Sequence, residues 1–182
     1  MNSFAPWTRS PWTDAALLAE MVHPDKVPTD AVGKAPHDWY GELVATNQLL
    51  EAIEFLAHGL PRYECAVWTA HALLEMDAVD RLDPLMVAVL RWIDEPSDKH
   101  RRICGDLAEK VRKDGPASLL SHAIMYSGGS VLPEDLDPVL PPPDVCAKLA
   151  GAALLSGAFD RPDPQAALRN SLRLGENVAA GR

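Results

Sequence analysis

The stretch SDKHRRICGDLAEKVRK, residues 97–113, carries the clearest structural signal in the chain. Charged side chains occupy most of it, and the remaining positions recur at steps of three and four along one stripe: His100, Ile103, Cys104, Leu107, Ala108 and Val111. This spacing is typical of an amphipathic α-helix, in which about 3.6 residues make one turn. We therefore predict a surface helix with one face buried against a helical core.

Further helices are indicated by apolar-periodic segments that open with proline or with a capping residue. Proline suits the first turn of a helix, because the amides of that turn have no acceptor within the helix. The prolines in question are Pro61, Pro84, Pro116 and Pro164, and Ser97 and Asp144 are candidate caps without a proline. We predict helices over residues 12–22, 42–58, 61–76, 84–94, 97–113, 116–126, 144–158 and 164–180. No sustained alternation of apolar and polar residues, as strands would require, accompanies them.

Short connections between consecutive helices favour antiparallel neighbours. The fold class that we predict is therefore all-α, a compact multi-helix bundle of antiparallel helical hairpins. The helix over 84–94 is apolar nearly all round, which predicts that it lies in the middle of the fold and organises the core. The helix over 144–158 is rich in alanine and glycine, which permits close approach by a neighbour. Paired helices also leave a solenoid open, although no repeat establishes one.

The first forty residues have a looser pattern, with many turn-forming residues. We predict an N-terminal arm and linker over residues 1–40 and a single helical domain over residues 41–182. Within the arm, Trp7 and Trp12 have two interpretations. They either anchor the arm to its own bundle, which we favour, or contact a partner protein, because tryptophan is common among residues that dominate interfaces.

Residues 127–143, SGGSVLPEDLDPVLPPP, cannot form helix or sheet, because five of them are proline. Three consecutive prolines favour a stiff extended backbone. The apolar side chains of this segment predict a Gly/Pro-rich strap that tucks them against the helices: Val131, Leu132, Leu136, Val139 and Leu140. The strap serves the fold alone, or it also offers a docking edge to a partner protein. The partner-binding residues of that second hypothesis are Trp7, Trp12, Leu132, Leu136, Val139 and Leu140.

Composition restricts the class of partner. With 182 residues, 47% of them hydrophobic, the chain can bury one substantial core. Its net charge of -9 would repel a phosphate backbone, so we predict no nucleic-acid partner. The longest apolar stretch, residues 145–159, carries Lys148 and is too short to cross a bilayer, so we predict no membrane insertion.

Cysteine usage indicates the compartment. Cys65, Cys104 and Cys146 are an odd number of widely spaced cysteines rather than a disulfide scaffold. Two prolines also interrupt the N-terminal region where a secretory signal would need an unbroken apolar run. We predict reduced thiols and a cytoplasmic protein.

One metal site can be constructed from the residues. His100 and Cys104 lie four apart on a helix, a spacing that lets both side chains reach one zinc ion, and His71 or Glu75 would have to complete the ligand set. The alternative is an edge histidine beside a buried thiol, since free cysteine commonly packs as a small hydrophobe. We favour the second interpretation and predict no metal.

Other polar groups lack the setting that catalysis needs. Neither Ser127 nor Ser130 has the glycine frame of a hydrolase nucleophile, and the two glycines between them are typical of a helix terminus. Ser121 and His122 are adjacent, but no carboxylate is evident to orient the histidine. The acids of the strap, Glu134, Asp135 and Asp137, lie on a loop where solvation keeps their proton affinities alike. We therefore predict no catalytic residue, no cofactor and no enzymatic activity.

Three stretches resemble a family of uncharacterised bacterial helical domains associated with type VI secretion gene clusters: LPRYECAVWTA (60–70), WIDEPSDKHRRICGDLAEKV (92–111) and SGGSVLPEDLDPVLPPPDVCAKLAGAALL (127–155). The resemblance covers about residues 45 to 181 and brings no catalytic residues with it. It implies a protein-binding accessory or adaptor of a bacterial secretion or assembly system. The alternatives are an immunity-type inhibitor of a basic toxin, for which an acidic chain is suited, and a metal-dependent enzyme. The oligomeric state is left open.

Overall fold

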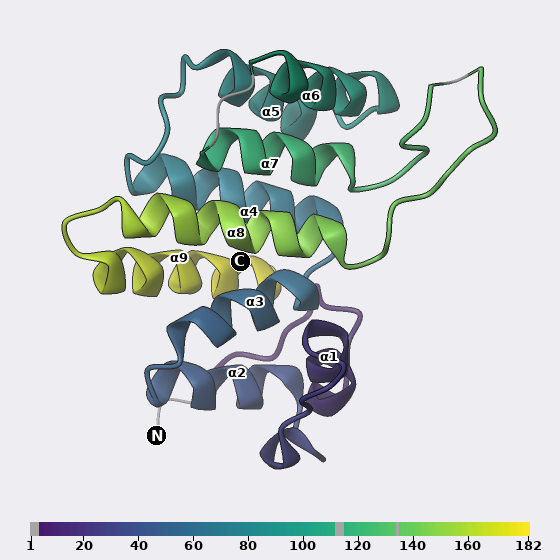
Figure 1. Ribbon diagram of the computed structural model, residues 1–182. Coiled ribbons are helices and arrows are strands. Elements are labelled where there is room, and N and C mark those ends of the chain that lie inside the picture. Colours follow the sequence, from purple (N-terminus) through teal and green to yellow (C-terminus); the bar gives the residue numbers. More distant parts are fainter. Residues whose placement is uncertain (1–3, 112–114, 134) are drawn as a thin grey trace.

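The computed structural model describes residues 4–111, 115–133 and 135–182, and over these it contains helices and no strands (Figure 1). The helices are α1 (Ala15–Val22), a short 3-10 helix η1 (Thr29–Ala31), α2 (Pro36–Ala45), α3 (Leu49–Gly59), α4 (Arg62–Glu75), α5 (Pro84–Asp94), α6 (Asp98–Val111), α7 (Pro116–Met125), α8 (Val145–Phe159) and α9 (Pro164–Ala179). The predicted all-α class is confirmed. Among the described residues, no helix is both long enough and apolar enough for a membrane crossing.

Capping explains most of the helix starts. The carboxylates of Asp14, Asp83 and Asp163 accept hydrogen bonds from amides in the first turns of α1, α5 and α9. These acceptors satisfy amides that have no partner within the helix. Ser97 caps α6 as predicted, since its Oγ lies 3.2 Å from the amide of His100. Asp144 precedes α8, but its side chain pairs with Lys148 instead of capping the helix.

The single helix predicted over residues 42–58 is wrong. The chain forms α2 and α3 here, separated by a turn in which Asn47 has a φ of 62°. This left-handed conformation ends a helix, and asparagine tolerates it better than most residues. Because α2 begins at Pro36, the boundary predicted at residue 40 lies inside a helix.

The centre of the fold is α8, which packs against α3, α4, α7 and α9. The prediction that residues 84–94 occupy the centre is wrong, because within the described residues the main neighbours of α5 are α4, α6 and α7, and it lies at one end of the stack (Figure 1). Small residues let four neighbours surround α8. A Cβ added at Gly157 would lie 2.7 Å from Cδ2 of Leu73, so a side chain of α4 packs closely on this glycine.

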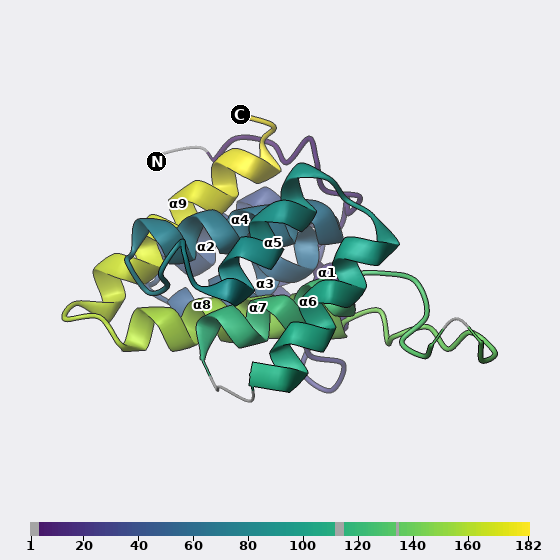
Figure 2. The same ribbon diagram turned by 90° about the horizontal axis from the view of Figure 1, so that it is seen from above.

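The N-terminal arm is part of the same core. Trp7 is 8% exposed and packs between the rings of Tyr40 and Phe55. Trp12 is half-buried, and its Nε1 donates a hydrogen bond of 3.2 Å to the carbonyl of His58. Residues 5–12 run beside the end of α9, as Figure 2 shows, and the amide of Arg9 donates to the carbonyl of Ala179. Trp7 is therefore packed into the core as an anchor of the arm.

Candidate functional site

Residues 127–143 connect α7 to α8 and extend away from the helices (Figures 1 and 2). We call this segment the projecting loop. The prediction that it tucks its apolar side chains against the bundle is wrong at three positions, since Leu136 is 53% exposed, Val139 48% and Leu140 72%. Of the five apolar side chains named above, Val131 and Leu132, near the base, are half-buried, and Pro141, next to Leu140, is buried. The physical reason is that the scaffold holds this segment through its backbone carbonyls, as described below, and not through its apolar side chains.

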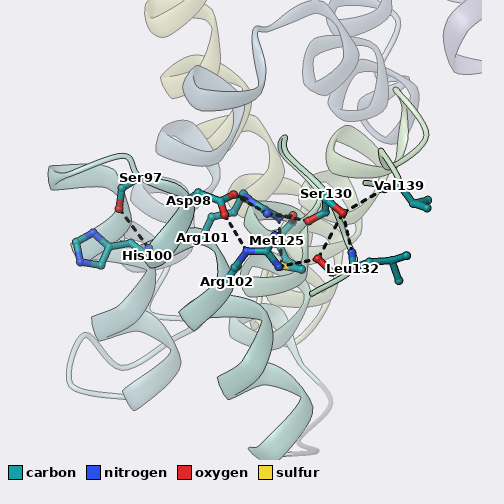
Figure 3. Close-up of polar contacts among 9 residues, drawn as sticks. All are labelled: Ser97, Asp98, His100, Arg101, Arg102, Met125, Ser130, Leu132 and Val139. Carbon is teal, nitrogen blue, oxygen red and sulfur yellow. Dashed lines mark hydrogen bonds and ion pairs between the residues drawn. The ribbon is translucent and has the colours of Figure 1, made fainter. Parts of the chain in front are cut away.

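The two arms of the projecting loop are hydrogen-bonded to each other. The amide of Val131 donates to the carbonyl of Val139 over 2.8 Å. The Oγ of Ser130 accepts from the amides of Leu132, at 3.0 Å, and Val139, at 3.1 Å, and Figure 3 shows this serine between the two arms. Ser130, weighed above as a nucleophile, thus has a structural role in the loop.

A buried arginine of α6 holds the base of the loop (Figure 3). Arg101 has only 4% of its side chain exposed, and its guanidinium donates to the carbonyls of Met125 and Ser130, the latter over 2.9 Å. Met125 is the last residue of α7, where carbonyls have no partner within the helix. One guanidinium therefore satisfies a free carbonyl at the end of α7 and also holds the first residues of the loop.

Asp98 orients two arginines toward the loop. Its Oδ1 accepts from Nε of Arg101 at 2.8 Å, and its Oδ2 accepts from Nε of Arg102 at 2.7 Å. Arg102 in turn donates from Nη1 to the carbonyl of Leu132 over 2.9 Å. Hydrogen bonds from Arg102 and then Arg101 lower the pKa of Asp98, so it stays ionised. We call Asp98, Arg101 and Arg102 the arginine clamp.

Gly129 lets the loop approach the clamp closely. Its φ is +63°, and an added Cβ would lie 2.8 Å from Oδ1 of Asp98 and 2.9 Å from Nη2 of Arg101. The sequence suggested that the glycines here end the preceding helix, and α7 does end just before them, at Met125. The close contact with the clamp is an additional constraint that local sequence does not reveal.

A third arginine ties the two roots of the loop together. Arg62, in the first turn of α4, donates from Nη1 to the carbonyl of Ser127 over 3.0 Å and from Nη2 to the carbonyl of Pro143 over 3.4 Å. These two residues begin and end the projecting loop. The helical scaffold therefore holds both ends, while Leu136 in the outer turn and Val139 and Leu140 in the returning arm stay exposed. We call these three side chains the apolar tip, although Val139 lies opposite Val131 near the base.

Sequence reasoning placed Cys104 and Ala108 correctly on the buried face of α6 but missed Arg101, because it centred the stripe on neighbouring apolar positions. The predicted stripe included Ile103, which is 37% exposed, and Val111, which is 43% exposed. The residues that the helix actually buries are Arg101, Cys104, Gly105 and Ala108. These four residues also have helical spacing. The three small ones, Cys104, Gly105 and Ala108, were the available signal that this face of the helix is closely packed and that Arg101 lies on it.

The residues considered for zinc do not form a site. His71 and Glu75 are exposed on α4, and Nδ1 of His100 lies 3.0 Å from the carbonyl of Glu95. Burial raises the pKa of the Cys104 thiol to about 12, which disfavours the thiolate that zinc needs. In the described parts of the chain, no three His, Cys, Asp or Glu side chains are grouped so that they could hold a metal ion.

The other polar candidates are also separated. Ser121 is fully buried, and its Oγ has no hydrogen-bond partner within the described structure, while Nδ1 of His122 lies 3.0 Å from the carbonyl of Ser118. Of the acids in the loop, Asp135 and Asp137 are exposed, and Glu134 lies outside the described residues. The three cysteines are buried free thiols.

Comparison with known proteins gives one match. A model described as a family of unknown function (DUF6931) matches residues 39–179, a span that contains α3 to α9, the arginine clamp and the projecting loop. No curated protein and no solved structure matches the chain.

Proposed function

Because the chain belongs to this family of unknown function, we propose its role from geometry: it is a non-catalytic protein-binding module whose docking element is the projecting loop. One observation carries the proposal. Leu136, Val139 and Leu140 are exposed on a loop whose base is fixed by a buried arginine. Exposed leucines on a rigid mount present apolar surface at a defined place, which is what a partner can recognise.

The size of the apolar tip suits a contact of moderate strength. Fully burying one such side chain contributes about 2 kcal/mol, so covering the exposed parts of these three supplies about 3–4 kcal/mol. A micromolar complex requires about 8 kcal/mol in all, net of association costs. The tip is therefore a substantial part of an interface, and the partner must also contact surface around it.

The backbone of the loop indicates how a partner binds. Five of its residues are prolines without an amide hydrogen, and the amides of Val131, Leu132, Leu136 and Val139 already donate within the loop. The prolines and these internal hydrogen bonds interrupt the row of donors that pairing with the edge of a sheet requires. We therefore propose that recognition uses side chains, in an apolar groove that receives Leu136 and Leu140.

Charge adds to this description of the partner. Asp135 and Asp137 are exposed beside the apolar tip, and the whole chain carries a net charge of -9. A groove with a basic rim would attract this loop and speed association. The partner that we propose is a protein with such a groove.

The proposed setting comes from the resemblance described above. It supports an accessory or adaptor role in the cytoplasm, for a component of a bacterial type VI secretion or related assembly system. The net charge of -9 favours one second candidate, an immunity-type inhibitor that binds a basic toxin. Toxicity of a neighbouring gene product when expressed alone, and its relief by this chain, would favour the inhibitor over the adaptor.

Site-specific crosslinking tests the docking element. A photo-reactive amino acid replaces Leu140 in one variant and Leu82 in another, and each is expressed in source cells. Leu82 is 81% exposed in the connection between α4 and α5, so it is a matched control. We expect one specific partner crosslinked through position 140 and none through position 82.

The affinity of the purified complex then provides the quantitative result. Leu140→Ser removes about 1.4 kcal/mol of apolar burial and should weaken binding about tenfold, while Leu82→Ser should leave it unchanged. Neither change should lower the melting temperature, because both side chains are exposed. Equal crosslinking at the two positions, or a Leu140→Ser complex of wild-type affinity, would refute the proposal.

A further inference from the structure

An apolar depression lies where the returning end of the projecting loop joins α8. Its volume is about 170 Å³, and its walls come from the arm, α1, α3, α4, α8 and Pro143 of the loop. Trp12, Met21 and Pro61 at the rim are half-buried and Pro143 is exposed, so the depression opens to the surface. We call it the root cavity. Buried side chains make its floor: Ala57, Leu60, Cys65, Cys146 and Ala147.

The lining of the root cavity favours an uncharged aromatic ring. Met21 and the two cysteines of the floor bring sulfur to it, and Trp12 brings an indole. Thioether sulfur and aromatic side chains both make favourable contacts with an aromatic ring. In the described structure no carboxylate lines the cavity, and the guanidinium of Arg62 is engaged with carbonyls of the loop. A charged side chain would therefore find no partner for its charge there.

The volume of the root cavity fits one such ring. An apolar protein cavity of about 150 Å³ takes up benzene. The root cavity, at about 170 Å³, therefore holds the ring of one phenylalanine. Because the cavity opens to the surface, the main chain that carries this ring can remain outside.

The root cavity lies close to the apolar tip. Leu140 precedes Pro143 by three residues, so their Cα atoms are at most about 11 Å apart. A standard interface buries about 800 Å² on each partner, a patch about 30 Å across. The mouth of the cavity therefore falls within the reach of a partner that covers the tip. The tip supplies only part of the free energy that a micromolar complex needs, and a buried aromatic anchor is the kind of contact that adds to it.

Building on the proposed function, we propose that the root cavity receives one phenylalanine side chain of the same partner whose groove receives the apolar tip. The tip enters the partner, and the partner's ring enters this chain beside Trp12. Insertion in both directions fixes the position of the partner along the loop, which a single apolar contact does not. Trp12 then has both of the roles that the sequence suggested, as an anchor of the arm and as a contact residue.

Toluene, the side chain of phenylalanine as a free molecule, tests the cavity without a partner. Nuclear magnetic resonance on the full chain follows the indole Nε1–H of Trp12 and the methyl group of Met21 as toluene is added. We expect both signals to shift and to reach saturation. Wild-type signals that stay unmoved would overturn the proposal.

Matched variants show that toluene occupies the root cavity. Ala57→Met places a flexible side chain in it and should weaken the toluene affinity about tenfold. Ala152→Met, on α8, lines a separate cavity and should leave the affinity unchanged. Equal toluene affinity in the two variants would also contradict the assignment. If Ala57→Met does not fold, the wild-type titration and the crosslinking below still decide the question.

Crosslinking in source cells tests the partner. A photo-reactive methionine analogue at position 21 should capture the same protein as the probe at position 140, attached at or next to a phenylalanine. Capture through position 140 alone would reject the role of the root cavity and leave the docking of the tip intact. Capture through neither position would reject the proposed function itself, and toluene binding would then show only that the cavity accepts an aromatic ring.

Discussion

Replacing Arg101 with methionine tests whether the arginine clamp holds the projecting loop. Methionine keeps an apolar stem of similar length but donates no hydrogen bond, so the carbonyls of Met125 and Ser130 lose their donor. A hydrogen bond from a charged donor contributes about 1.5–3 kcal/mol. Asp98 also loses Arg101 as a partner in this variant, but this adds little to the loss of stability because 49% of the Asp98 side chain is exposed to solvent. We expect a loss of about 3–4 kcal/mol in the free energy of unfolding.

Urea unfolding measures this loss, and amide exchange at Val139 locates it in the loop. For a chain of this length, each kcal/mol lowers the melting temperature by about 2–4 °C, so a fall of about 10 °C should accompany it. Arg101→Lys should lose about 1–2 kcal/mol, since one ammonium cannot span the fork of contacts. The matched control is Arg91→Met, whose guanidinium is 58% exposed and pairs with Glu95, and it should change stability by at most about 0.5 kcal/mol. If Arg101→Met and Arg91→Met are equally stable, the clamp does not anchor the loop.

Three further predictions concern packing, acid and thiols. Gly175→Ala should cost about 1–3 kcal/mol in thermal unfolding, because the new Cβ would lie 2.6 Å from both Leu56 and Trp68, whereas Gly128→Ala meets no atom within 4 Å and should be nearly neutral. The pKa of Asp98 is lowered by folding, so its contribution is present above the usual carboxyl pKa of 3.8 and is lost as pH falls through the folded value. Asp98→Asn should therefore flatten the dependence of unfolding free energy on pH below about pH 4, and an unchanged slope would contradict this. Burial raises the pKa of Cys104 to about 12 and of Cys146 to about 11, so a thiol reagent at neutral pH should label neither until urea unfolds the chain.

Helix starts were largely predictable because they depend on nearby residues, namely a proline in the first turn and a capping residue before it. Pro84, Pro116 and Pro164 each open a helix as expected, with a cap or a turn before them. The break between α2 and α3 was not predictable in this way, because Asn47 in a left-handed conformation replaces the glycine or proline that usually marks a turn. Local signals therefore predicted helix type well, but they missed both the start of α2 at Pro36 and the break between α2 and α3.

Which helix lies at the centre depends on packing between distant segments. The apolar surface of residues 84–94 suggested burial on all sides, but Val87 is 51% exposed. The small side chains of α8 let neighbouring helices pack around it on several sides, so α8 is central although it lacks the large apolar side chains of α5. Hydrophobicity alone does not record how closely another backbone can approach.

The sequence predicted which residues make up the candidate site but not how they are arranged in space. Residues 127–143 were identified from their prolines, yet the direction of the loop is set by Arg101, Arg102 and Arg62, which lie far from it in sequence. The contacts join side chains to backbone carbonyls, and carbonyls leave no signature in a sequence. This is why the strap was expected to lie along the helices.

Hydrogen bonds from arginines to backbone carbonyls make the protein a scaffold that can display different peptide sequences in the projecting loop. In the described part of the loop, the three arginines hydrogen-bond to backbone carbonyls, those of Ser127, Ser130, Leu132 and Pro143. Any amino acid supplies a carbonyl, so the scaffold does not restrict which side chains the outer turn carries. Other peptide sequences that replace residues 133–138 should therefore be held between the same two arms of the loop. New binding specificities can be built there without redesigning the helices.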